Sequence, residues 1–427
     1  MMKRRPIQFK EAVSLVLERA EKGKIHPLSL FEANGHFLGE DLIATHPMPP
    51  FDRSPYDGFA VRSEDTVGAT THSPNVLQII GEVAAGDVFV GTVKESEAVR
   101  IMTGGQIPQG ADAVIMLEAV KEVALEGKPH IHVRRPIQKN KNISFTGEDI
   151  PQGKVLVEAG SYINPGIIAL LATFGYEKVP VRKKPKVGIF VTGSELLDVA
   201  EPLQPGKIRN SNGYMIYAQV LRAGGEPVYL GKLSDDLDEN FTRIEAGLHD
   251  VDVLVTTGGV SVGDYDFMPD IFKKMDADVL FNKVGMRPGS VTTAAEKDGK
   301  MIFALSGNPS ACYVGFELFA RPFIRTVAGA RYPLLEKTAA CLGADFPKAN
   351  PFDRFVRGKL SFQNGRLVAT PLGLDKSSVV SSLAEADALI VFPAGTKGYQ
   401  AGMEVEVMLL ERQHGMSFSQ FYREKGE

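Results

Sequence analysis

Apolar segments alternate with amphipathic ones in a regular order between residues 186 and 326. Strands buried on both faces are predicted at residues 187–192, 227–231, 251–256, 279–284 and 301–305. Helical patterns are predicted at residues 214–221, 237–248, 267–275 and 309–326. Alternation of this kind is typical of a doubly wound, mostly parallel sheet with helices on both faces.

The flanking segments have different patterns. An amphipathic helix is predicted over residues 8–22, and a proline-rich stretch at residues 46–55 marks a boundary. Short β-like runs separated by glycine and proline turns follow up to residue 135. Past residue 332, β signals return around the hairpin turn Asn364-Gly365, which favours a small barrel or sandwich.

These patterns predict an α/β multidomain protein. A mixed N-terminal domain would combine residues 1–45 and 146–183, with a small β domain at residues 46–145 between its two parts. The doubly wound domain would occupy residues 184–330 and a C-terminal β domain residues 331–427.

Composition excludes several classes of protein. The 427 residues are too many for one core, and 44% hydrophobic with 23% charged residues is ordinary for a globular protein. A net charge of −4 gives no footprint for nucleic acid. Cys312 and Cys341 have no disulfide-framework or zinc spacing, and no stretch has the length to cross a bilayer. A cytoplasmic protein without nucleic-acid or membrane partners is therefore expected.

The loop after residue 256 carries the first candidate chemistry. It combines glycines and small hydroxyl groups with carboxylates, namely Gly258, Gly259, Ser261, Gly263, Asp264 and Asp266. Open α/β sheets bind ligands at this edge, where backbone amides approach an anion closely and carboxylates need a cation between them and that anion. The loop thus predicts a phosphorylated ligand with Mg²⁺, whereas the simpler interpretation is a connecting glycine turn.

Three other loops should reach the same edge of the sheet. They contain residues 192–195, 234–236 and 305–310. In the last loop Asn308 is expected as the helix N-cap and Pro309 as the first helical residue, so free amides would face an anion, unless this is an ordinary capped helix. Asp235 and Asp236 could equally bind a metal or cap the following helix. Lys283 and Arg287 would serve an oxyanion or lie on the surface as solvated cations.

Seven motifs in order resemble a known family. They read PPFDRSPYDGFAV, RIMTGGQIPQGADAVI, GEDI, VTGSEL, TTGGVSVGDYDF, MRPGS and LSGNPSA. The set is similar to the molybdopterin molybdenumtransferases of the MoeA type, which are related to the E domain of gephyrin. The resemblance implies a four-domain protomer in a homodimer, with the active site in a cleft between subunits. It also implies Mg²⁺-assisted insertion of molybdate into adenylylated molybdopterin, with release of AMP.

The resemblance also implies roles for individual residues. The catalytic positions would be Asp57, Thr103, Asp149, Glu195, Asp235 and Asp266. The positions that bind adenylylated molybdopterin would be Thr192, Gly193, Gly258, Gly259, Ser261, Gly263, Ser306, Gly307, Asn308, Pro309 and Ser310. Molybdate would meet Lys283, Arg287, Arg357 and Ser377, and Mg²⁺ would meet Asp235, Asp236, Asp264 and Asp266.

Three positions depart from the commoner family pattern. Arg287 stands where many relatives have lysine, Ser290 replaces a second lysine, and Ser306 replaces a proline. The loss of a lysine leaves open how many cations the molybdate pocket holds. Further expected partners are a molybdopterin adenylyltransferase and molybdoenzyme chaperones. The alternative functions are molybdopterin adenylylation itself and a non-enzymatic scaffold of the gephyrin kind.

Overall fold

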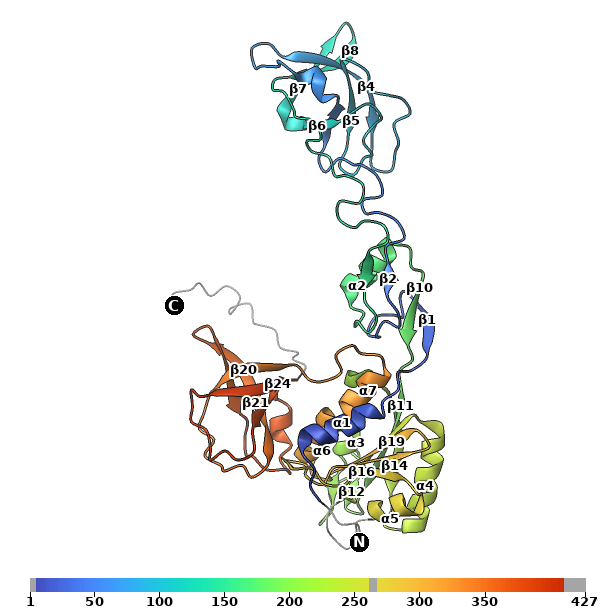
Figure 1. Cartoon of the computed structure of the whole chain (residues 1–427), viewed down its shortest axis with the longest axis vertical. Coiled ribbons are helices and arrows are strands. Elements are labelled where there is room, and N and C mark those ends of the chain that lie inside the picture. The colour runs from blue at the N-terminus through green and yellow to red at the C-terminus, as the bar shows by residue number, and fades with distance from the viewer. Residues whose placement is uncertain (1–4, 261–266, 411–427) are drawn as a thin grey trace. The chain divides into compact units, whose positions relative to one another are not determined.

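The computed structural model describes residues 5–260 and 267–410 (Figure 1). The chain divides into two compact units. One comprises Met1–Glu40, Ala159–Ile168 and Glu177–Glu427, and the other comprises Asp41–Glu158 and Ala169–Tyr176. The predicted division into four domains stays a prediction.

A six-stranded sheet forms the centre of the first unit. Its strand order is β14 (Glu226–Leu233), β11 (Lys186–Thr192), β15 (Val253–Thr257), β19 (Lys300–Leu305), β18 (Thr293–Lys297) and β16 (Asp278–Phe281). The first four strands are parallel, and β18 and β16 pair antiparallel. The predicted α/β fold with a mostly parallel sheet is confirmed, and β18 is an addition to it.

Helices cover both faces of this sheet. One core contains side chains from α1 (Phe9–Glu18), α3 (Asn212–Ala223) and α6 (Pro309–Gly315), and the other contains side chains from α4 (Leu237–Asp250) and α5 (Met268–Lys274). Within β15, Val253 and Val255 face the first core and Leu254 faces the second. This alternation explains why a strand buried on both faces is apolar throughout.

The helix predicted over residues 309–326 contains an irregular turn. Helix α6 continues through a π-helical turn, η3 (Phe316–Ala320), into α7 (Arg321–Val327). Glu317 in this turn is buried and pairs with Arg222 of α3 and with Gln219 Nε2 at 2.7 Å. Burial opposes the charge on Arg222, but Glu317 and Tyr313 outweigh it and raise the pKa of the guanidinium.

A closed barrel follows in the same unit. Strands β21 (Asp353–Gln363), β22 (Arg366–Pro371), β20 (Lys337–Leu342), β24 (Glu404–Leu409) and β23 (Ala388–Phe392) are neighbours in this order, and β23 also pairs with β21. Short β17 (Met286–Arg287) adds to β21. Asn364 and Gly365 have φ values of 49° and 75°, so the predicted hairpin between β21 and β22 is confirmed.

The second unit is built on another six-stranded sheet. Its order is β6 (Ala113–Met116), β3 (Gly58–Val61), β5 (Glu97–Ile101), β4 (Asn75–Val83), β8 (Lys128–Val133) and β7 (Val120–Leu125). Apolar side chains form a separate core on each side of it. β2 (Leu42–Ile43) pairs with β9 (Val155–Val157), and the 3₁₀ turns η1 (Ser63–Thr66) and η2 (Leu117–Ala119) join strands.

The remaining elements are short. β1 (Ile25–Ser29) pairs with β10 (Lys178–Arg182), β12 (Leu196–Leu197) pairs with β13 (Ile208–Arg209), and η4 is a 3₁₀ turn at Ser381–Leu383. Helix α2 (Pro165–Thr173) follows Asn164, whose Oδ1 accepts from Ile167 N at 3.0 Å. Helix α1 ends at Glu18, four residues before the predicted end at residue 22, because Arg19 and Ala20 close it with tighter i→i−3 bonds.

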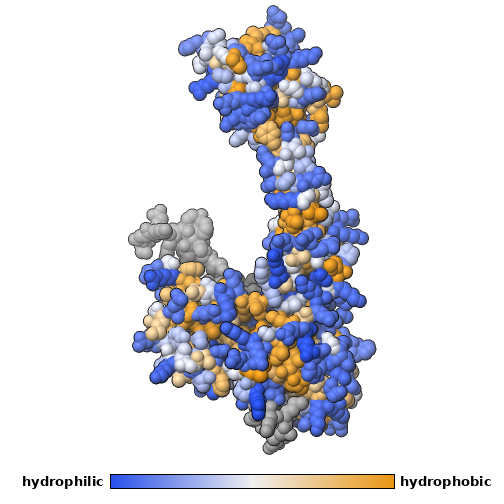
Figure 2. Space-filling view, viewed as in Figure 1, coloured by the Kyte–Doolittle hydropathy of each residue, from blue (hydrophilic) through white to orange (hydrophobic). Residues whose placement is uncertain are grey.

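The helices in the described ranges include none that is long and apolar enough to span a bilayer. Figure 2 shows hydrophilic residues over much of the visible face of each unit, with smaller hydrophobic areas between them.

Candidate functional site: a cavity at the strand ends

A cavity of about 1140 Å³ lies in the first unit at the carboxyl ends of the four parallel strands β14, β11, β15 and β19. Thr192, Gly193 and Glu195 follow β11, and Thr257, Gly258 and Gly259 end β15. The loop after β19 contributes Ser306, Gly307, Asn308 and Pro309. The loops that the sequence assigned to one edge of the sheet are therefore brought together there.

Gly258 is fixed between two neighbouring strands. Its N–H donates to Leu305 O at 3.0 Å, and Thr192 Oγ1 donates to the preceding carbonyl of Thr257 at 3.0 Å. Its φ is +92°, and a Cβ at this position would lie 2.7 Å from the backbone oxygen of Thr192. Only glycine fits, because both the left-handed backbone and the space exclude a side chain.

The loop at Ser306–Ser310 differs in one respect from the expectation. Asn308 occupies the N-cap position and Pro309 opens α6, as predicted, but the Asn308 side chain makes no capping bond. The Ser310 amide donates to Ser377 O at 2.9 Å. One amide that was expected to face an anion is therefore used to attach a loop of the barrel.

That barrel loop forms another part of the cavity wall. Ser377, Ser378 and Val380 line the cavity. Behind them Arg357 is fully buried and donates Nε to Ser382 Oγ at 3.2 Å and Nη2 to Leu374 O at 3.3 Å. Its Nη1 is buried and has no hydrogen-bond partner within the described residues. Burial lowers the pKa of this guanidinium, although an arginine keeps its charge.

The other predicted molybdate residues lie apart from the cavity wall. Lys283 is half-buried, Arg287 is exposed on β17, and neither belongs to the described lining of the cavity. Gly289, Ser290 and Val291 do line it. The serine that replaces a family lysine therefore faces the cavity.

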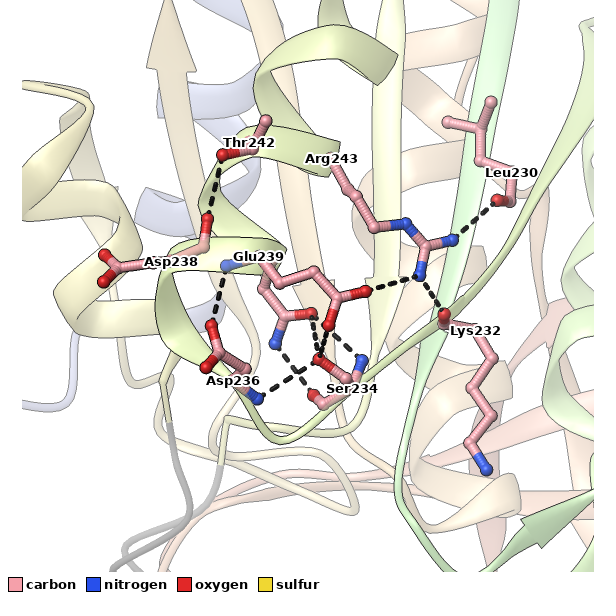
Figure 3. Close-up of polar contacts among 9 residues, drawn as sticks. Leu230, Lys232, Ser234, Asp236, Asp238, Glu239, Thr242 and Arg243 are labelled. Atoms are coloured by element: carbon pink, nitrogen blue, oxygen red, sulfur yellow. Dashed lines mark hydrogen bonds and ion pairs between the residues drawn. The ribbon is translucent and has the colours of Figure 1, made fainter.

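Asp235 and Asp236 are neighbours in the chain, but their side chains have different surroundings. Asp235 lines the cavity. Asp236 is the N-cap of α4, and its Oδ1 accepts from Glu239 N at 2.8 Å (Figure 3). Ser234 Oγ donates to Glu239 Oε2 at 2.7 Å (Figure 3). Asn240 Nδ2 donates to Ser234 O at 2.8 Å, so these bonds hold the turn in place. Of the two interpretations, the capping role describes Asp236.

Three predicted residues lie in the second unit. Asp57 Oδ1 accepts from Thr103 N at 2.6 Å and from Thr103 Oγ1 at 2.8 Å. These two bonds lower the pKa of the Asp57 carboxyl. The Asp149 amide donates to Met48 O at 3.1 Å. The structure thus brings Asp57 and Thr103 together.

Four predicted residues, Ser261, Gly263, Asp264 and Asp266, lie outside the described part of the chain. The described residues show no group of three or more His, Cys, Asp or Glu side chains placed to hold a metal ion. Two carboxylates, those of Glu195 and Asp235, nevertheless line the cavity. Mg²⁺ is commonly held by one or two carboxylates together with substrate phosphates, so these residues fit such an ion.

One segment of the cavity wall was missed in the sequence. The cavity is also lined from the end of β13 to the start of α3, by Arg209, Asn210, Ser211 and Asn212. Asn212 is buried and donates Nδ2 to Thr257 Oγ1 and to Gly307 O, both at 2.9 Å. The signal was the polar run Asn-Ser-Asn-Gly directly before a helix, at the same edge as the other loops.

Three family models match the chain in succession. Residues 7–175 match the MoeA N-terminal region (domain I and II), residues 188–326 a probable molybdopterin binding domain, and residues 339–410 the MoeA C-terminal region (domain IV). A molybdopterin molybdenumtransferase of Bacillus subtilis (strain 168) is 52% identical over 413 residues, which are 97% of this chain and 96% of that protein. The protein of the same name from Staphylococcus aureus (strain Mu50 / ATCC 700699) is 45% identical over 96% of this chain and 97% of its own length.

Solved structures agree with these matches. The molybdopterin biosynthesis moeA protein from Pyrococcus horikoshii OT3 has a TM-score of 0.81 at 33% identity, over 95% of this chain and all of that chain. A second structure of a moeA protein from the same genus gives a TM-score of 0.82 at 30% identity, over 95% and 99%. These matches define an α/β enzyme of molybdenum cofactor biosynthesis. The chain belongs to the MoeA family of molybdopterin molybdenumtransferases.

Proposed function

We propose that this chain inserts molybdenum from molybdate into adenylylated molybdopterin and releases AMP. The observation that carries the proposal is the composition of one cavity. Its sheet side presents glycine loops and the carboxylates of Glu195 and Asp235, and its barrel side presents the Ser377 loop backed by the buried Arg357. Such walls suit two kinds of ligand. One is an anion that is bound through a metal ion, and the other is an oxyanion.

The size of the cavity supports a large ligand. At about 1140 Å³ it exceeds the roughly 300–1000 Å³ of sites for drug-sized molecules. A pterin joined to a nucleotide needs this room. On this proposal Gly258, Gly259 and Gly307 bring their backbone close to the phosphates, where a side chain would keep them apart.

The acidic residues are proposed to hold Mg²⁺ at the phosphates. Glu195 and Asp235 would hold the ion, and Asp264 and Asp266 remain expected ligands from the sequence. When bound, Mg²⁺ would neutralise charge on the phosphate that leaves with AMP. Asp236 is not included, because its carboxylate already caps α4.

Arg357 is the proposed cation for molybdate, although it lies behind the Ser377 loop and, like Lys283 and Arg287, does not belong to the described lining of the cavity. A buried guanidinium with an unpartnered Nη1 gains most from an anionic acceptor, since a buried donor without a partner is costly. Lys283 and Arg287 stay predictions as molybdate groups, as does Ser377. Ser310 Oγ is a further buried hydroxyl without a partner in the described residues, next to the Ser377 loop.

The alternatives are not favoured. The family matches cover both flanking regions as well as the sheet domain, whereas an adenylyltransferase would need the sheet domain alone. Scaffolding does not require two carboxylates and glycine loops on one cavity.

The test is an insertion assay with the purified full-length chain. Adenylylated molybdopterin, Mg²⁺ and molybdate are mixed with the protein. The AMP and the molybdenum cofactor that are released from the protein are then quantified. We expect AMP release and cofactor formation that both depend on molybdate. Sulfate, a tetrahedral dianion without molybdenum, is the control. AMP release that is equally fast with sulfate, or no AMP release at all, would overturn the proposal.

Several expectations stay predictions. They are the homodimer, the Mg²⁺ requirement, a cytoplasmic location, and contacts with an adenylyltransferase or molybdoenzyme chaperones.

In the proposed dimer, Asp57, Thr103 and Asp149 of one subunit would serve the active site of the other. Mixing two variants of reduced activity, one with Asp57→Ala and one with Asp235→Ala, tests this. Recovery of activity on mixing is expected, and no recovery in a mixed dimer shown to form would contradict it.

A further inference from the structure

The hydroxyl of Thr257 is a hydrogen-bond hub beneath the cavity. It donates to Ser306 O at 3.0 Å and accepts from Asn212 Nδ2 at 2.9 Å and from Cys312 Sγ at 3.4 Å. A hydroxyl has one proton to donate and two lone pairs to accept with, so its whole capacity is used. Thr257 is only 2% exposed, and these bonds are therefore shielded from competing water.

The hub joins three separate elements around one loop. Asn212 opens α3, Thr257 ends β15, and Cys312 lies in α6. Asn212 uses its second amide hydrogen on Gly307 O at 2.9 Å. Two successive carbonyls of the loop, those of Ser306 and Gly307, are thus held by the same network.

Holding these carbonyls also orients the amides of the loop. In a trans peptide the C=O and the next N–H point in opposite directions. Because Ser306 O points to Thr257, the N–H of Gly307 points away from the hub. Ser306, Gly307 and Asn308 all line the cavity, so the hub fixes the backbone that a ligand would meet.

We propose that Thr257 is a positioning residue, which holds the Ser306–Gly307 backbone in the orientation that binds a phosphate of the substrate. This inference rests on the proposed function of the cavity. Thr257 itself need not touch the substrate. The role of Thr257 is to hold the Gly307 N–H in the binding orientation before the ligand arrives. Orienting this N–H then costs no conformational entropy on binding.

The chain offers a matched control in the neighbouring residue. Thr256 is also fully buried in β15, but its Oγ1 has no hydrogen-bond partner within the described residues. Replacing either threonine by valine conserves shape and removes one hydroxyl. Only at position 257 does the change break three bonds. Thr257→Ser keeps the hydroxyl and removes the methyl group, which separates hydrogen bonding from packing.

The experiment measures KM and kcat for adenylylated molybdopterin and, by calorimetry, the affinity for AMP alone. For Thr257→Val we expect both KM and the Kd for AMP to rise about tenfold, the loss of about one charge-assisted hydrogen bond, with kcat within about twofold. Thr257→Ser and Thr256→Val should match the wild type in all three. Thermal unfolding of each variant is recorded alongside.

Several outcomes would overturn the inference. Wild-type KM and AMP affinity in Thr257→Val would do so, as would an equal loss in Thr256→Val or in Thr257→Ser. If Thr257→Val does not fold, Asn212→Ala removes two arms of the network, and unchanged AMP affinity in that variant is contrary to the proposal. Failure of wild-type turnover would instead count against the proposed function, while the AMP measurements would still decide the role of Thr257.

Discussion

At the scale of single residues, contacts with Thr103 determine the direction in which the pKa of Asp57 is shifted. Both hydrogen bonds to Oδ1 come from Thr103 and favour the ionised carboxylate, so the pKa is lowered. A depressed folded-state pKa contributes stability above the unfolded pKa, and this contribution is lost as the pH falls through the folded pKa. Asp57 should therefore stay ionised in mildly acidic solution.

The change to test is Thr103→Val, which removes the hydroxyl and keeps the amide. We expect the carboxyl pKa of Asp57, followed by ¹³C NMR titration, to lie below the ordinary aspartate value in the wild type and to move upward in the variant. Thr146→Val is the control, because its hydroxyl donates to Asp52 and not to Asp57. A wild-type titration midpoint at or above the ordinary value would contradict the assignment.

The pair Asp235 and Asp236 allows a second prediction at this scale. Asp236→Ala removes an N-cap and should lower the free energy of unfolding by about 1 kcal/mol. Asp235→Ala should leave stability within about 0.5 kcal/mol and reduce the dependence of turnover on Mg²⁺. Denaturant titration and activity at several Mg²⁺ concentrations measure the two effects. The reverse pattern would exchange the roles of the two aspartates.

At the scale of elements, the end of β15 depends on a glycine. Gly258→Ala should cost about 1–2 kcal/mol for its left-handed backbone alone, and more because the new Cβ would crowd the backbone of Thr192. Gly299→Ala is a matched control, since Gly299 also has a positive φ but nothing lies within 4 Å of its added Cβ. Chemical denaturation should show the larger loss at position 258. Equal losses would mean that Thr192 moves aside without cost.

Sequence patterns were sufficient to predict some of the helices and strands but not others. The apolar strands β11, β15 and β19 were predicted because burial on both faces demands apolar residues throughout. Strand β18 was missed because its segment Thr-Ala-Ala-Glu-Lys has small and charged residues and forms only by pairing with β19. The π-helical turn at Phe316–Ala320 has no sequence signature either, since two of the partners of Glu317, Gln219 and Arg222, come from α3.

At the scale of the whole molecule, the second unit contains complete cores of its own. All members of its two main apolar clusters lie between Phe59 and Ile143. A chain of residues 46–145 should therefore fold alone and unfold cooperatively on heating, because every described side chain of these two clusters lies within it. Circular dichroism and dispersed amide NMR signals measure this. A fragment without a thermal transition would show that the predicted domain boundary is wrong.

The sequence alone determined the class of fold, the family, and the edge of the sheet at which glycine loops and carboxylates gather. These properties follow from local periodicity and from the rule that parallel strands end on one side. Only the tertiary structure decided that Asp236 is a cap, that Ser310 gives its amide to Ser377, that Arg357 is buried behind the cavity, and that Asn212 and Thr257 support its floor. The reason is physical. A hydrogen bond between residues 45 or 67 positions apart depends on how strands and helices pack, and composition and spacing carry no record of that packing.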